Sequence, residues 1–129
     1  HIHIFFEMGD GSHVAFFELP ESPAMRLDPN TPEWVQHLAL RVEDMDTLHR
    51  CKTRLAEAGV EVLGPVDHTI CQSIYFFDPS GHRLELTVAT SSPELDRRLA
   101  SEAPGLLEEW TRTKRAPERD GLHAHLDDS

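Results

Sequence analysis

The sequence predicts an α+β fold built from βαβββ modules, one complete and one partial. In residues 36–89, a strand with alternating polar and apolar residues precedes a segment with helical spacing and then three more strand-like segments. Residues 1–19 contain two strand-like segments and a turn, which match only the last hairpin of such a block. The order of elements therefore indicates a weak internal repeat whose first copy is truncated at its N-terminus.

The first 35 residues divide into a hairpin and a linker. Residues 1–19 hold two β-rich segments joined by a glycine-containing turn at residues 9–12, and we expect the C-terminal hairpin of the first module there. Residues 20–35 contain four prolines, a composition typical of a linker rather than of a compact element.

The complete module begins with a strand and a helix. In residues 36–42, Leu38 and Leu40 share one face of the predicted strand and alternate with residues on the other face. Residues 44–58 carry apolar side chains three and four positions apart, and Gly59 stands where the glycine that ends a helix belongs. We therefore expect an amphipathic helix that packs on one face of the sheet.

Three further strands are expected to complete this module. A short strand over residues 60–63 is predicted to end at Gly64 and Pro65. Longer strands are predicted over residues 70–77 and 83–88, joined by a turn whose second residue is the proline that a type I turn favours.

Beyond the module we expect a helical extension over residues 90–115 and a disordered tail over residues 116–129. Ser92 and the proline after it form a typical helix start, and Pro104 is predicted to divide the extension into two helical pieces. The tail is polar and has few large apolar residues, as disordered segments do.

The composition excludes several classes of function. A chain of 129 residues suffices for one domain, and its net charge of −11 disfavours binding to nucleic acid or to an anionic membrane. It has no apolar run long enough for a membrane span and no signal-peptide pattern, and its two cysteines form no disulfide framework, so we expect a cytoplasmic protein. Nine histidines justify a search for a metal site.

Three side chains suited to metal binding or acid–base chemistry share the sheet face away from the predicted helix. His37, Tyr75 and Glu85 each alternate with apolar neighbours that face the helix. An imidazole, a phenol and a carboxylate on one face form a candidate metal site. Ordinary solvent-facing residues of a half-buried sheet would show the same alternation, so the pattern alone leaves both interpretations open.

Residues 72–86, with the sequence QSIYFFDPSGHRLEL, strongly resemble the vicinal oxygen chelate superfamily. This superfamily includes glyoxalase I, extradiol ring-cleaving dioxygenases, fosfomycin-resistance thiol transferases and bleomycin resistance proteins. The resemblance extends over residues 36–89 and, less closely, over residues 1–19. It implies the glyoxalase/bleomycin resistance/dioxygenase fold, in which two βαβββ modules form a cup-shaped sheet around a divalent metal.

The resemblance implies roles for four residues. His37 and Glu85 match the metal-ligand positions, with Fe(2+) as the expected metal and Mn(2+) or Zn(2+) as alternatives. A third ligand is expected from a strand before residue 1 or from a second chain, which leaves a homodimer open. Tyr75 and His68 match residues that orient the substrate and transfer protons in extradiol enzymes. A loop histidine without a chemical role is the alternative for His68.

We therefore predict a metal-dependent enzyme, specifically an extradiol-type dioxygenase that cleaves the ring of a small catecholic aromatic molecule. A glyoxalase-type isomerase or a thiol transferase would use the same His37 and Glu85 but would leave His68 idle. A metal-free protein that binds an aromatic small molecule is the third alternative.

Overall fold

The computed structural model describes residues 1–115, and the predicted tail over residues 116–129 lies outside the described residues. In chain order the elements are β1 (Ile2–Glu7), β2 (His13–Glu18), β3 (His37–Arg41), α1 (Met45–Glu57), β4 (Leu63–Asp67), β5 (Cys71–Phe77), β6 (Arg83–Ala89) and α2 (Pro93–Thr113). The predicted βαβββ order of the complete module is confirmed. Neither helix of residues 1–115 is long and apolar enough to cross a membrane.

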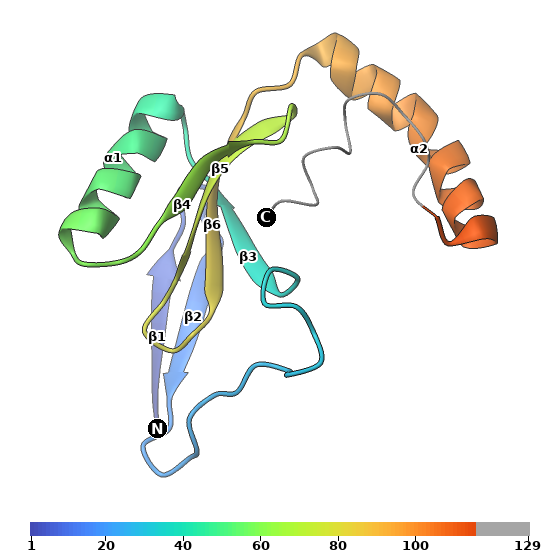
Figure 1. Cartoon of the computed structure of the whole chain (residues 1–129). Helices are drawn as coiled ribbons and strands as arrows, with labels where there is room; N and C mark the ends of the chain where they lie inside the picture. The colour runs from blue at the N-terminus through green and yellow to red at the C-terminus, as the bar shows by residue number, and fades with distance from the viewer. Residues whose placement is uncertain (116–129) are drawn as a thin grey trace.

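Four strands of the module form one sheet in the order β3-β6-β5-β4. β3 runs parallel to β6, and the other neighbours are antiparallel. α1 lies along one side of this sheet (Figure 1). Leu48 of α1 and Ile74 of β5 are fully buried, and Val88 of β6 completes the centre of the core. The predicted helix on one face is therefore confirmed, and the side chains that alternate with Ile74 and Val88 face away from it.

α1 begins and ends where the sequence predicts. The Asp44 carboxylate accepts a hydrogen bond from the backbone N–H of Thr47 at 2.7 Å, as an N-cap residue does. Gly59, just beyond the helix, has a φ of +79°, a left-handed conformation that glycine adopts without strain.

Three expectations from the sequence were wrong. The fourth strand covers Leu63–Asp67 instead of residues 60–63, because β4 is an edge strand and tolerates a proline that donates no hydrogen bond. α2 is one helix that contains Pro104, since a proline can bend a helix without ending it. Leu38 is 45% exposed, because α1 packs on β5 and β6 and leaves the edge strand β3 uncovered.

β1 and β2 pair only with each other in the described chain and form the predicted hairpin as a separate two-stranded sheet. Both faces of this hairpin carry exposed apolar side chains. Ile2, Ile4 and Phe6 lie on one face of β1, and Phe5 and Phe17 lie on the other face of the hairpin. The hairpin therefore adds nothing to the core around Leu48.

Replacing Gly64 by alanine is expected to destabilise the four-stranded sheet strongly. Gly64 has a φ of +104°, and an added Cβ would lie 2.6 Å from the Ser73 carbonyl oxygen on β5. Backbone strain and this contact together should cost roughly 2–5 kcal/mol of unfolding free energy. Gly59→Ala is the matched control, because a Cβ there has no neighbour within 4 Å and only the positive φ is penalised, by roughly 1–2 kcal/mol.

Urea unfolding monitored through tyrosine absorbance measures both effects, because the single tyrosine of the chain lies on β5. Equal losses of unfolding free energy for Gly64→Ala and Gly59→Ala would contradict the close approach of β4 to β5 at Gly64.

Candidate metal and acid–base site

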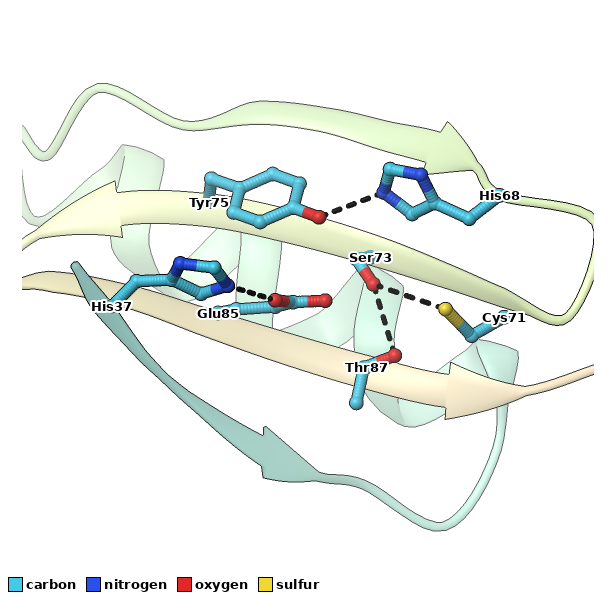
Figure 2. A network of polar contacts seen from close by, with 7 residues as sticks. All are labelled: His37, His68, Cys71, Ser73, Tyr75, Glu85 and Thr87. Carbon is cyan, nitrogen blue, oxygen red and sulfur yellow. Dashed lines mark hydrogen bonds and ion pairs between the residues drawn. The ribbon is translucent and has the colours of Figure 1, made fainter. Parts of the chain in front are cut away.

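Two hydrogen-bonded pairs of candidate site residues lie on the sheet face opposite α1, together with a hydrogen bond between Ser73 and Thr87 (Figure 2). One pair joins His37 of β3 to Glu85 of β6, and the other joins His68, just after β4, to Tyr75 of β5. The strand register brings the pairs together, because Tyr75 lies directly opposite Glu85 in the β5–β6 ladder. The His37 and Tyr75 rings meet edge-on with their centroids 6.1 Å apart.

His37 and Glu85 are in direct contact. The His37 Nε2 atom lies 2.9 Å from the Glu85 Oε2 atom. The Glu85 residue is only 7% exposed, whereas the His37 side chain is 31% exposed and lines a cavity of about 520 Å³. The carboxylate is therefore held inside the sheet face, with the imidazole between it and the cavity.

The donor set of this pair fits a divalent metal in part. An imidazole nitrogen and a carboxylate oxygen suit Fe(II), Mn(II) and Zn(II). Residues 1–115 contain no group of three or more histidine, cysteine, aspartate or glutamate side chains that could hold a metal ion. His37 and Glu85 therefore offer two protein ligands, and further donors would have to come from substrate, water or other polypeptide.

A tight turn after β4 places His68 beside Tyr75. The backbone N–H of His68 donates to the Cys71 carbonyl at 2.9 Å, and the Asp67 carboxylate accepts from the Thr69 N–H at 2.7 Å. The His68 Nε2 atom then lies 2.7 Å from the Tyr75 hydroxyl. The His68 Nδ1 atom is buried and has no hydrogen-bond partner in the described chain, so one ring nitrogen is unpaired.

Burial raises the pKa of Tyr75 to about 12, and the negative charge of Glu85 adds to the shift. The phenol is therefore uncharged at neutral pH and can donate a hydrogen bond. Tyr75 is 9% exposed, so neither it nor Glu85 is an ordinary solvent-facing residue of a half-buried sheet. Their burial excludes the interpretation that these two residues simply face solvent.

The alkaline titration of the chain should report Tyr75 directly, because Tyr75 is the only tyrosine. The folded chain holds the phenol proton more tightly than the unfolded chain, whose tyrosine titrates near 10.0. Stability is therefore unaffected by this group below pH 10 and falls as the pH rises towards 12, by about 2–3 kcal/mol for a shift of this size. Phenolate absorbance measures the titration of Tyr75, and urea unfolding at several pH values measures the loss of stability. A titration midpoint near pH 10 in the folded chain would contradict the burial of Tyr75.

Sequence reasoning missed Arg83, which lies on the same face of β6 as Glu85. Arg83 is 7% exposed, and its guanidinium carbon lies 4.7 Å from the centroid of the Tyr75 ring. The signal was present, because residues two apart on a strand share a face. It was overlooked because arginine two residues before a carboxylate is also common on solvated strands.

A comparison with protein families identifies the superfamily of the chain. The family model of the Glyoxalase/Bleomycin resistance protein/Dioxygenase superfamily matches residues 1–86, and the chain belongs to this superfamily. The resemblance of residues 72–86 and the predicted α+β fold class are thereby confirmed.

One solved structure supports the assignment of the fold, and two others are similar over part of their length. A glyoxalase/dioxygenase from Nostoc punctiforme is 24% identical with a TM-score of 0.56, and the match covers 69% of this chain and 61% of that one. A fosfomycin resistance protein from Listeria monocytogenes is 23% identical with a TM-score of 0.49, over 68% of this chain and 66% of that one. An integron cassette protein from the Halifax Harbour sewage outfall metagenome is 32% identical with a TM-score of 0.46, over 65% of this chain and 66% of that one. The chain thus spans about three fifths of the Nostoc protein.

Proposed function

We propose that the protein is a metal-dependent dioxygenase of the extradiol type that cleaves the ring of a catecholic aromatic substrate. The contact between His68 and Tyr75, beside the His37–Glu85 pair, is the observation that carries this proposal. It supplies an imidazole and a phenol, the two acid–base groups that ring cleavage needs, next to two suitable metal ligands. The two free cysteines are compatible with a cytoplasmic location.

His37 and Glu85 would hold the metal, which we propose to be Fe(II). When bound, the metal would supply Lewis-acid chemistry that lowers the pKa of a catechol hydroxyl and orients both reactants. Tyr75 donates its hydroxyl hydrogen to a substrate oxygen. His68 accepts a proton at one ring nitrogen and returns it later, and its Nδ1 atom has no hydrogen-bond partner within residues 1–115.

The cavity that His37 lines provides space for an aromatic ring. Its volume of about 520 Å³ lies in the range of small-molecule sites. Apolar side chains form much of its wall, including Phe16, Met25, Leu27 and Leu38. A flat apolar ring can lie against this wall with its hydroxyl groups towards His37.

A glyoxalase-type isomerase or a thiol transferase would use the same His37 and Glu85. Neither chemistry requires the turn that brings His68 to the Tyr75 hydroxyl. A metal-free binding protein would require neither pair. The second pair therefore favours ring cleavage over these alternatives.

Oxygen consumption tests the proposal. The purified chain is reconstituted anaerobically with Fe(II), mixed with catechol and exposed to oxygen. Oxygen consumption is followed with an oxygen electrode, and the coloured ring-cleavage product is followed by its absorbance. Uptake of one oxygen molecule per catechol is expected, and Zn(II)-loaded protein serves as the control without redox activity. Retention of iron without oxygen uptake from any catechol would remove the dioxygenase assignment and favour the isomerase or transferase.

A further inference from the structure

The side chain of Arg83 is a buried cation that has no counter-ion in the part of the chain that the structure describes. It is 7% exposed, and no group of the described residues forms a hydrogen bond with its buried Nε atom. No carboxylate of residues 1–115 forms an ion pair with it. The guanidinium stacks over the Tyr75 ring, and its N–H groups have no hydrogen-bond acceptor among the described residues.

A guanidinium keeps its charge at any ordinary pH, so it cannot relieve its burial by losing a proton. A buried charge is costly unless it is paired and hydrogen-bonded. We therefore expect the Arg83 guanidinium to bind an anionic acceptor. An aromatic face on one side of the guanidinium leaves its edge free to bind two oxygens of a carboxylate side by side.

The carboxylates near Arg83 are engaged elsewhere or do not reach it. Glu85, on the same strand face, is 2.9 Å from His37. One oxygen of Asp78 accepts from the N–H groups of Ser80 and His82, at 2.9 and 2.8 Å. Glu33 and Glu61 line a smaller cavity of about 350 Å³ with Arg83 but form no ion pair with it.

Arg83 also lines the cavity of about 520 Å³ that holds His37. A second guanidinium, that of Arg26, lines the same cavity, so its wall carries two permanent positive charges. Among the described residues, Asp78 is the one carboxylate in this wall, and hydrogen bonds within its turn hold one of its oxygens. The cavity thus combines a candidate metal ligand, an apolar wall and an excess of positive charge.

We propose that Arg83 binds an anionic substituent of the substrate in this cavity, and that the substrate is therefore a catechol carrying a carboxylate group. The catechol part of this inference rests on the proposed function, whereas the carboxylate part rests on Arg83 alone. Arg83 acts as a specificity-determining residue: it selects a charged ring over a neutral ring of the same shape.

Binding to the metal-free chain tests the inference without ring cleavage. Isothermal titration calorimetry compares 3,4-dihydroxybenzoate with the neutral 3,4-dihydroxybenzamide, which has nearly the same shape. The wild-type chain should bind the acid about 10–100-fold more tightly, the difference that a charge-assisted hydrogen bond makes. Raising the salt concentration should reduce this preference. Equal affinity for acid and amide in the wild-type chain would overturn the inference.

Three variants locate the effect. Arg83→Gln should remove the preference for the acid, and Arg83→Lys, which keeps the charge but loses the planar fork, should keep only part of it. Arg50→Gln is the matched control, because Arg50 is an exposed arginine on α1 that bonds to Thr47. Loss of the preference in Arg50→Gln, or its full retention in a folded Arg83→Gln, would contradict the assignment to Arg83.

The two proposals fail in different ways. If the chain prefers the acid but consumes no oxygen with either ligand, the role of Arg83 is supported and the dioxygenase function is contradicted. If the chain consumes oxygen with the same kcat/KM for the acid and the amide, the dioxygenase function is supported and the role of Arg83 is contradicted.

Discussion

Glu85→Ala and His37→Ala should each abolish retention of a divalent metal by the reconstituted chain. The two side chains are the only pair of metal-ligand type that the sheet face brings together among the described residues, with Nε2 and Oε2 2.9 Å apart. Removal of either leaves one protein ligand, too few to hold a metal through dialysis. Metal content after dialysis, measured by elemental analysis, checks this, and the wild-type chain should retain up to one metal per chain.

Controls separate lost ligation from lost folding. Glu85→Gln keeps the volume and the hydrogen bond to His37 but removes the charge, so the sheet should remain while metal is lost. His49→Ala removes an exposed histidine of α1 and should leave metal content unchanged. Wild-type metal content in Glu85→Ala and His37→Ala would contradict the proposed centre.

His68→Ala should lower ring-cleavage turnover by roughly 10²–10⁴-fold, the usual contribution of a positioned acid or base. Metal content should remain close to that of the wild type, because His68 contacts Tyr75 rather than His37 or Glu85. Turnover per bound iron, measured with an oxygen electrode, separates this effect from metal loss.

Tyr75→Phe provides the comparison for His68→Ala. It removes the hydroxyl but retains the ring that lies under the Arg83 guanidinium, so its loss of turnover should be smaller. Full activity in iron-loaded His68→Ala would remove the acid–base role and leave His68 as a loop residue that only packs against Tyr75.

The ends of a helix could be predicted from the sequence where the residue at that position determines them. Asp44 and Gly59 mark the limits of α1 because capping and positive φ depend on the residue itself. β4 was misplaced because tolerance of Pro65 depends on the strand lying at the sheet edge, which is a property of the whole sheet. The same applies to α2, where bending around Pro104 competes with ending the helix.

The candidate site was predictable where strand alternation controls side-chain direction. His37, Tyr75 and Glu85 follow from this alternation alone. His68 lies in a turn, where no periodicity applies, and only the resemblance to a family indicated it; the placement of its ring near Tyr75 required the structure. The burial of Arg83 could not be predicted either, because burial depends on segments far away in the chain.

The separation of the hairpin from the four-stranded sheet has a thermodynamic consequence. An isolated two-stranded hairpin is marginally stable in water, and β1 and β2 share no core with α1 and the sheet. The two parts therefore lack the shared burial that makes a small domain unfold in one cooperative step. The hairpin can therefore unfold before the sheet, and a probe on β5, such as its tyrosine, follows the sheet.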